Sequence, residues 1–145
     1  MFNLEPTLSA GAEDIRRALT ETRTIAVIGL SPDPTKDSNM VARYLQQAGY
    51  RIIPVYPKEN EILGEKVYRS LAEIPDRIDM VDIFRKAEFI DRVVDEVLER
   101  EDVRYIWVQL GLVNNPAAAR ATAAGRVVVQ NLCSKVEHQK IFSDR

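Results

Sequence analysis

The sequence contains one cysteine, one histidine and no apolar run as long as a membrane-spanning helix. A single cysteine, Cys133, excludes an intrachain disulfide framework and is typical of proteins of the reducing cytoplasm. Cys133 and His138 cannot by themselves supply the ligands of a usual zinc site, so we expect no metal. The chain does not begin with the basic stretch and apolar core of a secretory signal. We therefore expect a cytoplasmic, metal-free protein that is not associated with a membrane.

An excess of charge of one sign is also lacking. The chain has 20 basic and 22 acidic residues, a formal net charge of -2 and no long run of either sign. This balance gives no electrostatic footprint for nucleic acid or for an anionic membrane surface. With 145 residues, of which 46% are hydrophobic and 29% charged, the composition is that of a soluble globular protein. We expect a single domain over residues 1–145.

The most informative segment is 24–48. A β-branched apolar run at 25–28 ends at Gly29, and a polar loop follows it. Strand, glycine turn and helix form the opening unit of a nucleotide-binding α/β domain, where loop amides and the helix N-terminus face a phosphate. The loop holds one glycine, two prolines and one lysine, so it is not the G-x-G-x-x-G of dinucleotide-binding domains. The apolar residues at helical spacing after the loop are Met40, Val41, Tyr44, Leu45 and Ala48.

Strand-like and helix-like segments alternate along the whole chain. Apolar stretches predict strands at 25–28, 51–56, 80–84, 105–110 and 127–130. Amphipathic spacing predicts helices at 9–21, 38–48, 87–100, 115–125 and 132–141, a helical turn at 70–74 and an irregular connection at 57–69. Ser9 and Asn115 are the expected N-caps of the first and fourth helices. Pro54 conflicts with the second strand because it has no N–H, so we expect it near the strand end, where pairing stops.

Five short apolar strands separated by helices predict a parallel sheet covered on both faces. Right-handed crossovers make such a sheet doubly wound and Rossmann-like. We expect the five strands in the order 3-2-1-4-5.

Ligands of such sheets bind beyond the carboxyl ends of the strands. The end of the second strand is informative, because an NAD-binding domain usually carries an acidic residue there for the ribose hydroxyl. This chain has Pro57-Lys58 instead. A lysine at this point favours a ligand with a phosphate on the adenosine ribose, such as CoA or NADP. Lys36 and Arg85 add two further cations at strand ends; each alone could be a solvated surface residue, but together they favour an anion site.

Five motifs at the strand ends resemble those of a known family. They are Ile25-Ala-Val-Ile-Gly-Leu-Ser-Pro-Asp-Pro34, Gly49-Tyr-Arg-Ile-Ile-Pro-Val-Tyr-Pro-Lys58, Asp79-Met-Val-Asp-Ile-Phe-Arg85, Trp107-Val-Gln-Leu-Gly111 and Cys133-Ser-Lys-Val-Glu-His138. They are similar to those of the small single-domain CoA-binding proteins, which in turn resemble the N-terminal domain of the succinyl-CoA synthetase α subunit. The resemblance covers a core of about residues 22–140. The sequence departs from the family at Gln130-Asn131-Leu132, where a Met-Asp-Arg-like triplet would be expected.

The resemblance implies CoA or an acyl-CoA as the ligand and a set of binding residues for each part of it. The residues implied along the phosphates are Gly29, Ser31, Pro32, Lys36 and Ser38. Those implied near the 3′-phosphoadenosine are Pro57 and Lys58, those beside the adenine and the pantetheine arm are Ile83, Phe84 and Arg85, and those bordering the distal arm are Gln109 and Gly111.

The residues offer no obvious catalytic pair. Cys133 is expected to pack as a small hydrophobic residue, and His138 has no identifiable nucleophile beside it. The phosphohistidine of the synthetase belongs to a second domain, so His138 does not inherit that role. Asp82, in the middle of the third strand, either lies near the ligand or is hydrogen-bonded structurally, and we favour the second alternative. We therefore assign no catalytic residue and expect no turnover by this chain alone.

Three functions remain open at this stage. The first is a stand-alone CoA-binding or acyl-CoA-binding module that serves as a carrier, sensor or regulator with an unidentified protein partner. The second is an NADP-dependent or CoA-dependent enzyme of unknown reaction. The third is an interaction domain whose nucleotide pocket is vestigial.

Overall fold

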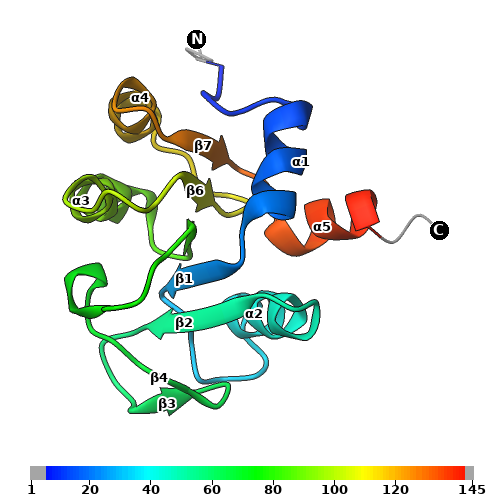
Figure 1. Ribbon diagram of the computed structural model, residues 1–145, viewed down its shortest axis with the longest axis vertical. Helices are drawn as coiled ribbons and strands as arrows, with labels where there is room; N and C mark the ends of the chain where they lie inside the picture. The colour runs from blue at the N-terminus through cyan, green and yellow to red at the C-terminus, as the bar shows by residue number, and fades with distance from the viewer. Residues whose placement is uncertain (1–5, 143–145) are drawn as a thin grey trace, which may run out of the picture.

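The computed structural model, which describes residues 6–142, has a parallel sheet of five strands between two layers of helices (Figure 1). The sheet strands are β1 (Thr24–Ile28), β2 (Arg51–Val55), β5 (Met80–Ile83), β6 (Tyr105–Val108) and β7 (Val127–Gln130). Each pairs in parallel with its neighbour. The predicted α/β, Rossmann-like, doubly wound class is therefore confirmed, and all five predicted strands are present.

The predicted strand order is wrong. The sheet runs β2-β1-β5-β6-β7, so the third of the five strands in chain order pairs with the first and not with the second. The reason lies in Pro54, which is near the end of β2 as expected. It is paired with Val27, however, and the pairing continues to Val55. The Pro54 carbonyl accepts from the Tyr68 N–H on the outer edge of β2, at 3.0 Å. Since N–H and C=O of one residue face the same side of a parallel strand, the missing N–H of Pro54 also faces outward, where a further strand would need it.

The alternating strand residues form two cores. Ala26 and Ile28 of β1 pack under α3 (Ala87–Leu98), α4 (Asn115–Ala123) and the short 3₁₀ helix η1 (Leu71–Glu73). Ile25 and Val27 pack under α1 (Ala12–Glu21), α2 (Asp37–Gln47) and α5 (Ser134–Phe142). Figure 1 shows these two groups of helices on opposite faces of the sheet. Both faces of every central strand are therefore buried, as expected for a parallel sheet.

The connection between β2 and β5 is more ordered than the sequence predicted. Residues 57–69, expected to be irregular, contain a small antiparallel hairpin of β3 (Glu61–Ile62) and β4 (Glu65–Lys66). Ile62 and Val67 are buried against the α2 side of the sheet. Strands of two residues are too short for the alternation of apolar and polar residues to reveal them.

Two expected N-caps differ from those observed. Gly11 caps α1, whereas the Ser9 hydroxyl accepts the Gln130 N–H at 2.9 Å. This contact helps to place the N-terminal segment along the edge of β7, where the Ala10 N–H also donates to the Val128 carbonyl at 2.8 Å. The cap of α4 is Asn114, whose side chain accepts from the Ala117 N–H; Asn115 and Pro116 lie in its first turn. None of the described helices has the length and apolar character needed to cross a membrane.

Candidate functional site

The carboxyl ends of the sheet strands open into two adjoining hollows. The carboxyl-edge cavity, of about 510 Å³, is lined by residues that include Asp37, Phe84, Arg85, Gln109, Leu112 and Lys135. The loop recess, of about 420 Å³, lies at the start of α2 and is lined by residues that include Gly29, Ser31, Lys36, Ser38 and Tyr56. Asp37 and Phe84 line both hollows, which therefore adjoin at these two residues.

Gly29 joins the first loop to the end of β5. Its φ of +84° lies in the left-handed region, and an added Cβ would stand 2.7 Å from the Phe84 carbonyl oxygen. The neighbouring ladder is intact, because the Gly29 N–H donates to the Val55 carbonyl and the Phe84 N–H to the Ile28 carbonyl, each at 2.9 Å. Only glycine satisfies both the φ and the close approach. The turn thus brings Phe84 to the border between the two hollows.

The loop after Gly29 is held by its own polar side chains. The Ser31 N–H donates to the Ser38 hydroxyl at 3.0 Å, and the Asn39 amide donates to the Ser31 carbonyl at 2.8 Å. Asp33 accepts from the backbone N–H and the hydroxyl of Thr35, and these hydrogen bonds lower the pKa of the Asp33 carboxyl. The Asp33–Thr35 contacts are those of an Asx turn, and all of these hydrogen bonds lie within residues 31–39. The loop is therefore shaped before any ligand arrives.

The N-terminus of α2 faces the loop recess. Lys36 is the N-cap residue of α2, and its side chain makes no cap hydrogen bond. The Lys36 carbonyl accepts from the Met40 N–H, which begins the hydrogen bonds of the helix. The uncapped amides of a first turn carry partial positive charge and bind anions well. Asp37, in the same turn, brings one negative charge to this point. The remaining charged residues that line the two hollows are basic: Lys36, Arg85, Lys86 and Lys135.

The loop after β2 is held by Arg69, a residue that is distant from it in the sequence. Arg69 donates from Nη1 to the carbonyls of Tyr56 at 3.1 Å, Lys58 at 3.1 Å and Glu59 at 2.9 Å. Tyr56 lines the loop recess, whereas Pro57 and Lys58 are exposed and line neither hollow. Sequence reasoning missed Arg69, because no local motif connects a residue of the 57–69 segment with carbonyls about a dozen positions earlier.

Some of the other predicted site residues line a hollow, and some do not. Phe84, Arg85 and Gln109 lie together in the carboxyl-edge cavity. Ile83 is fully buried in the core under α3 and α4, Pro32 is exposed on the loop, and Gly111 is exposed with its N–H donated to Asn131 Oδ1 at 2.7 Å. None of these three lines either hollow.

A buried polar network lies next to the cavity. Asp82 of β5 is fully buried, and its two carboxyl oxygens accept from Gln109 Nε2 at 2.6 Å and from the Ser134 hydroxyl at 3.0 Å. Gln109 Nε2 also donates to Ser134 Oγ at 2.7 Å. Burial raises the pKa of Asp82 to about 7, and the hydrogen bonds from Gln109 and Ser134 oppose this shift. The expected hydrogen bonding of Asp82 is thus confirmed; its partners come from β6 and α5 and could not be read from sequence spacing.

Cys133 and His138 do not form a pair. Cys133 is half-buried and lines the carboxyl-edge cavity. His138 Nδ1 lies 2.7 Å from the Tyr44 hydroxyl and packs against the rings of Tyr50 and Phe142. Desolvation lowers the pKa of His138. Its surroundings are those of a packed aromatic cluster.

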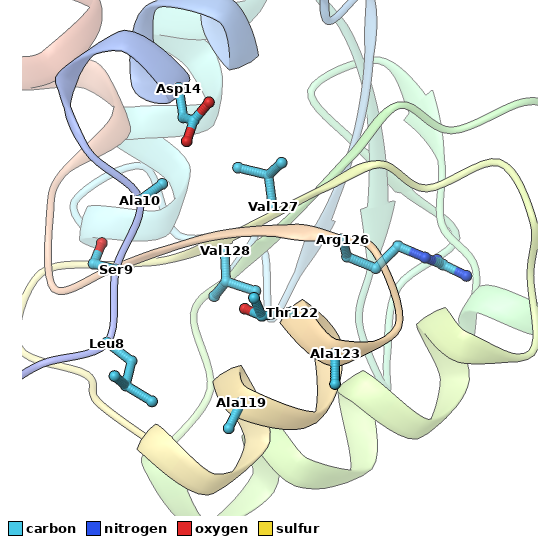
Figure 2. Close-up of a pocket in the computed structure, with 10 residues that line it drawn as sticks. All are labelled: Leu8, Ser9, Ala10, Asp14, Ala119, Thr122, Ala123, Arg126, Val127 and Val128. Carbon is cyan, nitrogen blue, oxygen red and sulfur yellow. The ribbon is translucent and has the colours of Figure 1, made fainter.

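A further cavity, of about 550 Å³, lies between the N-terminal segment, α4 and β7 (Figure 2). Small and apolar side chains such as Leu8, Ala119 and Val128 surround it (Figure 2). Arg126 contributes a cation, but its guanidinium already donates to the carbonyls of Val103 and Arg100, each at 2.9 Å. This cavity contains none of the predicted site residues and offers less for recognising an anion than the carboxyl-edge cavity.

Comparison with known proteins places the chain in a family. The model of the CoA binding domain matches residues 23–139, so the chain belongs to this family. The expected resemblance to the small CoA-binding proteins is therefore confirmed.

Three relatives illustrate the range of the family. The uncharacterized protein YneT of Bacillus subtilis is 44% identical, and the match covers 86% of this chain and 92% of that protein. A hypothetical protein from Pyrococcus horikoshii superimposes with a TM-score of 0.86 at 37% identity, over 95% of this chain and 99% of that one. The α subunit of the ADP-forming acetate–CoA ligase I of Pyrococcus furiosus is 41% identical over 54% of this chain, and the match spans 18% of that subunit.

Proposed function

We propose that this protein binds CoA or an acyl-CoA across the carboxyl edge of its sheet, as a nucleotide-binding module. The observation that carries the proposal is that two chemically different hollows adjoin at Phe84 and Asp37. CoA is long, with a strongly anionic nucleotide end and an amide-bearing arm, and it needs a site with two different ends.

The loop recess suits the anionic end of the ligand. It combines the glycine turn at Gly29, the uncapped first turn of α2 and the Lys36 cation. Helix amides and a lysine are the groups that bind phosphates in proteins. Lys58, on the exposed loop after β2, is proposed to reach the 3′-phosphate of the ribose.

The carboxyl-edge cavity suits the arm. Phe84, Leu110 and Leu112 supply apolar surface, and Gln109 supplies a buried amide. Arg85 also lines this cavity, and its guanidinium lies 4.6 Å from the centre of the Phe89 ring. Pockets of this kind bind by apolar contact and take their specificity from a few placed polar groups.

The role of binding is proposed to be that of a carrier, sensor or regulator that acts with a protein partner. The groups lining the two hollows are mainly apolar residues, three lysines, Arg85 and the amide of Gln109. These groups bind anions and amides but do not readily move protons at neutral pH. We expect no steady hydrolysis or transfer of an acyl group when the purified chain is incubated with acetyl-CoA. Turnover that is lost in Cys133→Ala would contradict this role.

Calorimetry tests the ligand. CoA is expected to bind about tenfold or more tightly than dephospho-CoA, since one charge-assisted hydrogen bond is worth about 1.5 to 3 kcal/mol. NAD, which has neither the 3′-phosphate nor the arm, is expected to bind more weakly still. Absence of CoA binding would refute the proposal, and equal affinity for CoA and dephospho-CoA would remove the 3′-phosphate contact from it.

A further inference from the structure

Two buried glutamines stand side by side in the fold and differ in how their oxygens are used. Gln109 directly follows β6 and is 4% exposed; Gln130 ends β7 and is 2% exposed. The Gln130 oxygen accepts the Asn114 N–H at 2.7 Å, and its nitrogen donates to the Leu8 carbonyl at 2.8 Å. Gln130 is therefore satisfied within the protein.

Gln109 uses only its nitrogen. Both of its N–H groups are taken, by Asp82 Oδ1 at 2.6 Å and by Ser134 Oγ at 2.7 Å. Its oxygen receives no hydrogen bond from any residue between 6 and 142, and it is not among the fully enclosed unpaired atoms of those residues, so it is accessible from the carboxyl-edge cavity. Such an acceptor binds water in the free protein and can accept a hydrogen bond from a donor of a bound ligand.

The orientation of the Gln109 amide follows from its two partners. An ionised carboxylate can only accept, and Ser134 uses its hydroxyl hydrogen on Asp82 Oδ2 at 3.0 Å, which leaves its oxygen as an acceptor. Two acceptors on one side hold the Gln109 nitrogen there and turn the oxygen to the other side. Since Gln109 lines the carboxyl-edge cavity, that other side is the cavity.

We propose that the Gln109 oxygen accepts a hydrogen bond from an amide N–H in the arm of the ligand, and that Asp82 and Ser134 are positioning residues that keep this oxygen aimed at it. The inference rests on the proposed function and deepens it, because it names the polar group that selects the arm. Arg85 and Lys86, which line the same cavity, are exposed, whereas Gln109 is neutral and only 4% exposed. Leu112 and Phe84 add apolar surface to this cavity. A neutral acceptor in apolar surroundings favours a neutral donor, as an amide N–H is.

The ligand can be divided to test this contact separately. CoA carries two amide N–H groups, both in the pantetheine arm, whereas adenosine 3′,5′-bisphosphate has the nucleotide end without the arm. Binding of both compounds is to be measured by calorimetry at about pH 8, where Asp82 is mostly ionised because its pKa is about 7. The variants are Gln109→Met, Asp82→Asn and, as the matched control at the neighbouring strand end, Gln130→Met.

In Gln109→Met we expect the affinity for CoA to fall about tenfold, the effect of one hydrogen bond with its desolvated partner. The affinity for the bisphosphate should stay within about twofold, which also shows that the variant is folded. Asp82→Asn presents a donor where the carboxylate accepted, so the amide should turn and the same selective loss of CoA affinity should follow. The double variant should lose no more than the single ones, because both changes remove one contact. Gln130→Met should bind both compounds as the wild type does.

Three outcomes would overturn the inference. If Gln109→Met binds CoA as tightly as the wild type, the oxygen makes no contact with the arm. If CoA and the bisphosphate weaken in parallel, Gln109 supports the site as a whole and does not select the arm. If the wild type binds the bisphosphate as tightly as CoA, the arm is not held, although the proposed nucleotide site stands. Failure of the wild type to bind either compound would instead refute the proposed function and the inference with it.

Discussion

Two aspartates next to the candidate site have pKa values shifted in opposite directions. Asp33, on the exposed loop after β1, accepts two hydrogen bonds from Thr35, and these lower the pKa of its carboxyl. Asp82, in β5, also accepts two hydrogen bonds, but burial outweighs them and raises the pKa to about 7. We call the solvated loop at 29–38 and the exposed loop after β2 the rim of the site. The desolvated network of Asp82, Gln109 and Ser134 is its floor. The rim can bind charge, whereas the floor can orient a neutral group.

The largest expected effect is on stability and comes from Gly29→Ala, at the contact between the first loop and the end of β5. The new Cβ would stand 2.7 Å from a backbone oxygen of Phe84 at a φ of +84°. We expect a loss of roughly 3 kcal/mol or more in the free energy of unfolding, measured by guanidinium denaturation. Gly64→Ala is the matched control, with a φ of +78° and no atom within 4 Å of the added Cβ, and it should cost only about 1 to 2 kcal/mol. Equal losses in the two variants would show that the contact with Phe84 is unimportant.

The second effect is the pH dependence of the free energy of unfolding that Asp82 contributes. The folded-state pKa of Asp82 is about 7, above the ordinary value of 3.8. Between these values the folded protein holds a proton that the unfolded chain has released, so the free energy of unfolding falls as the pH rises. The slope can reach about 1.4 kcal/mol per pH unit. Asp82→Asn cannot titrate, so between about pH 5 and 7 the wild type should lose roughly 2 kcal/mol relative to this variant. If the free energies of unfolding of the wild type and Asp82→Asn change equally between about pH 5 and 7, the pKa of Asp82 is not raised by folding.

Lys58→Ala tests the proposed contact between the exposed loop after β2 and the 3′-phosphate of CoA. Because Lys58 is exposed and its backbone carbonyl is what Arg69 holds, its side chain is expected to serve the ligand and not the fold. Affinity for CoA should fall about tenfold or more, while affinity for dephospho-CoA should not change. Lys66→Ala is the control, since Lys66 lies on β4 with its ammonium 5.0 Å from the centre of the Tyr68 ring. A lower melting temperature of ligand-free Lys58→Ala with unchanged affinity would make Lys58 a structural residue.

The smallest effect is expected from Thr35→Val. The substitution removes the hydroxyl that donates to Asp33 at 2.8 Å but keeps the backbone N–H that donates at 2.9 Å. The pKa of Asp33 should move part of the way back toward 3.8, while the melting temperature should hardly change because the pair is exposed to solvent. Titration of the Asp33 carboxyl by NMR measures this shift. An Asp33 pKa that does not differ between wild type and Thr35→Val would show that the backbone N–H acts alone.

The sequence was sufficient for those parts of the fold that depend on neighbouring residues. The apolar run before Gly29, the helical spacing after Ser38 and the strand at 127–130 follow from local patterns, and the structure has each of them. The strand order was not predictable in this way. It depends on which side of β1 receives β5, and the deciding feature is the side of β2 to which the absent N–H of Pro54 points.

The candidate site follows the same division. The recess residues Gly29, Ser31, Lys36 and Ser38 lie on one loop, and the structure places all four around one hollow. The Asp82–Gln109–Ser134 network joins β5, the end of β6 and the start of α5. Arg69 likewise reaches carbonyls on a different turn. Such contacts depend on tertiary packing, for which the spacing of residues carries no signal.

Pro54 has a further consequence for the protein in concentrated solution. An open strand edge invites a strand of another molecule, and edge-to-edge growth of this kind leads to aggregates. On the outer edge of β2, a docking strand would find no donor at Pro54 and would find the carbonyl of Pro54 already bound to Tyr68. At the opposite end of the sheet, the Val128 carbonyl of β7 is already bound to the Ala10 N–H. One proline and one short segment thereby shield both borders of the sheet from self-association.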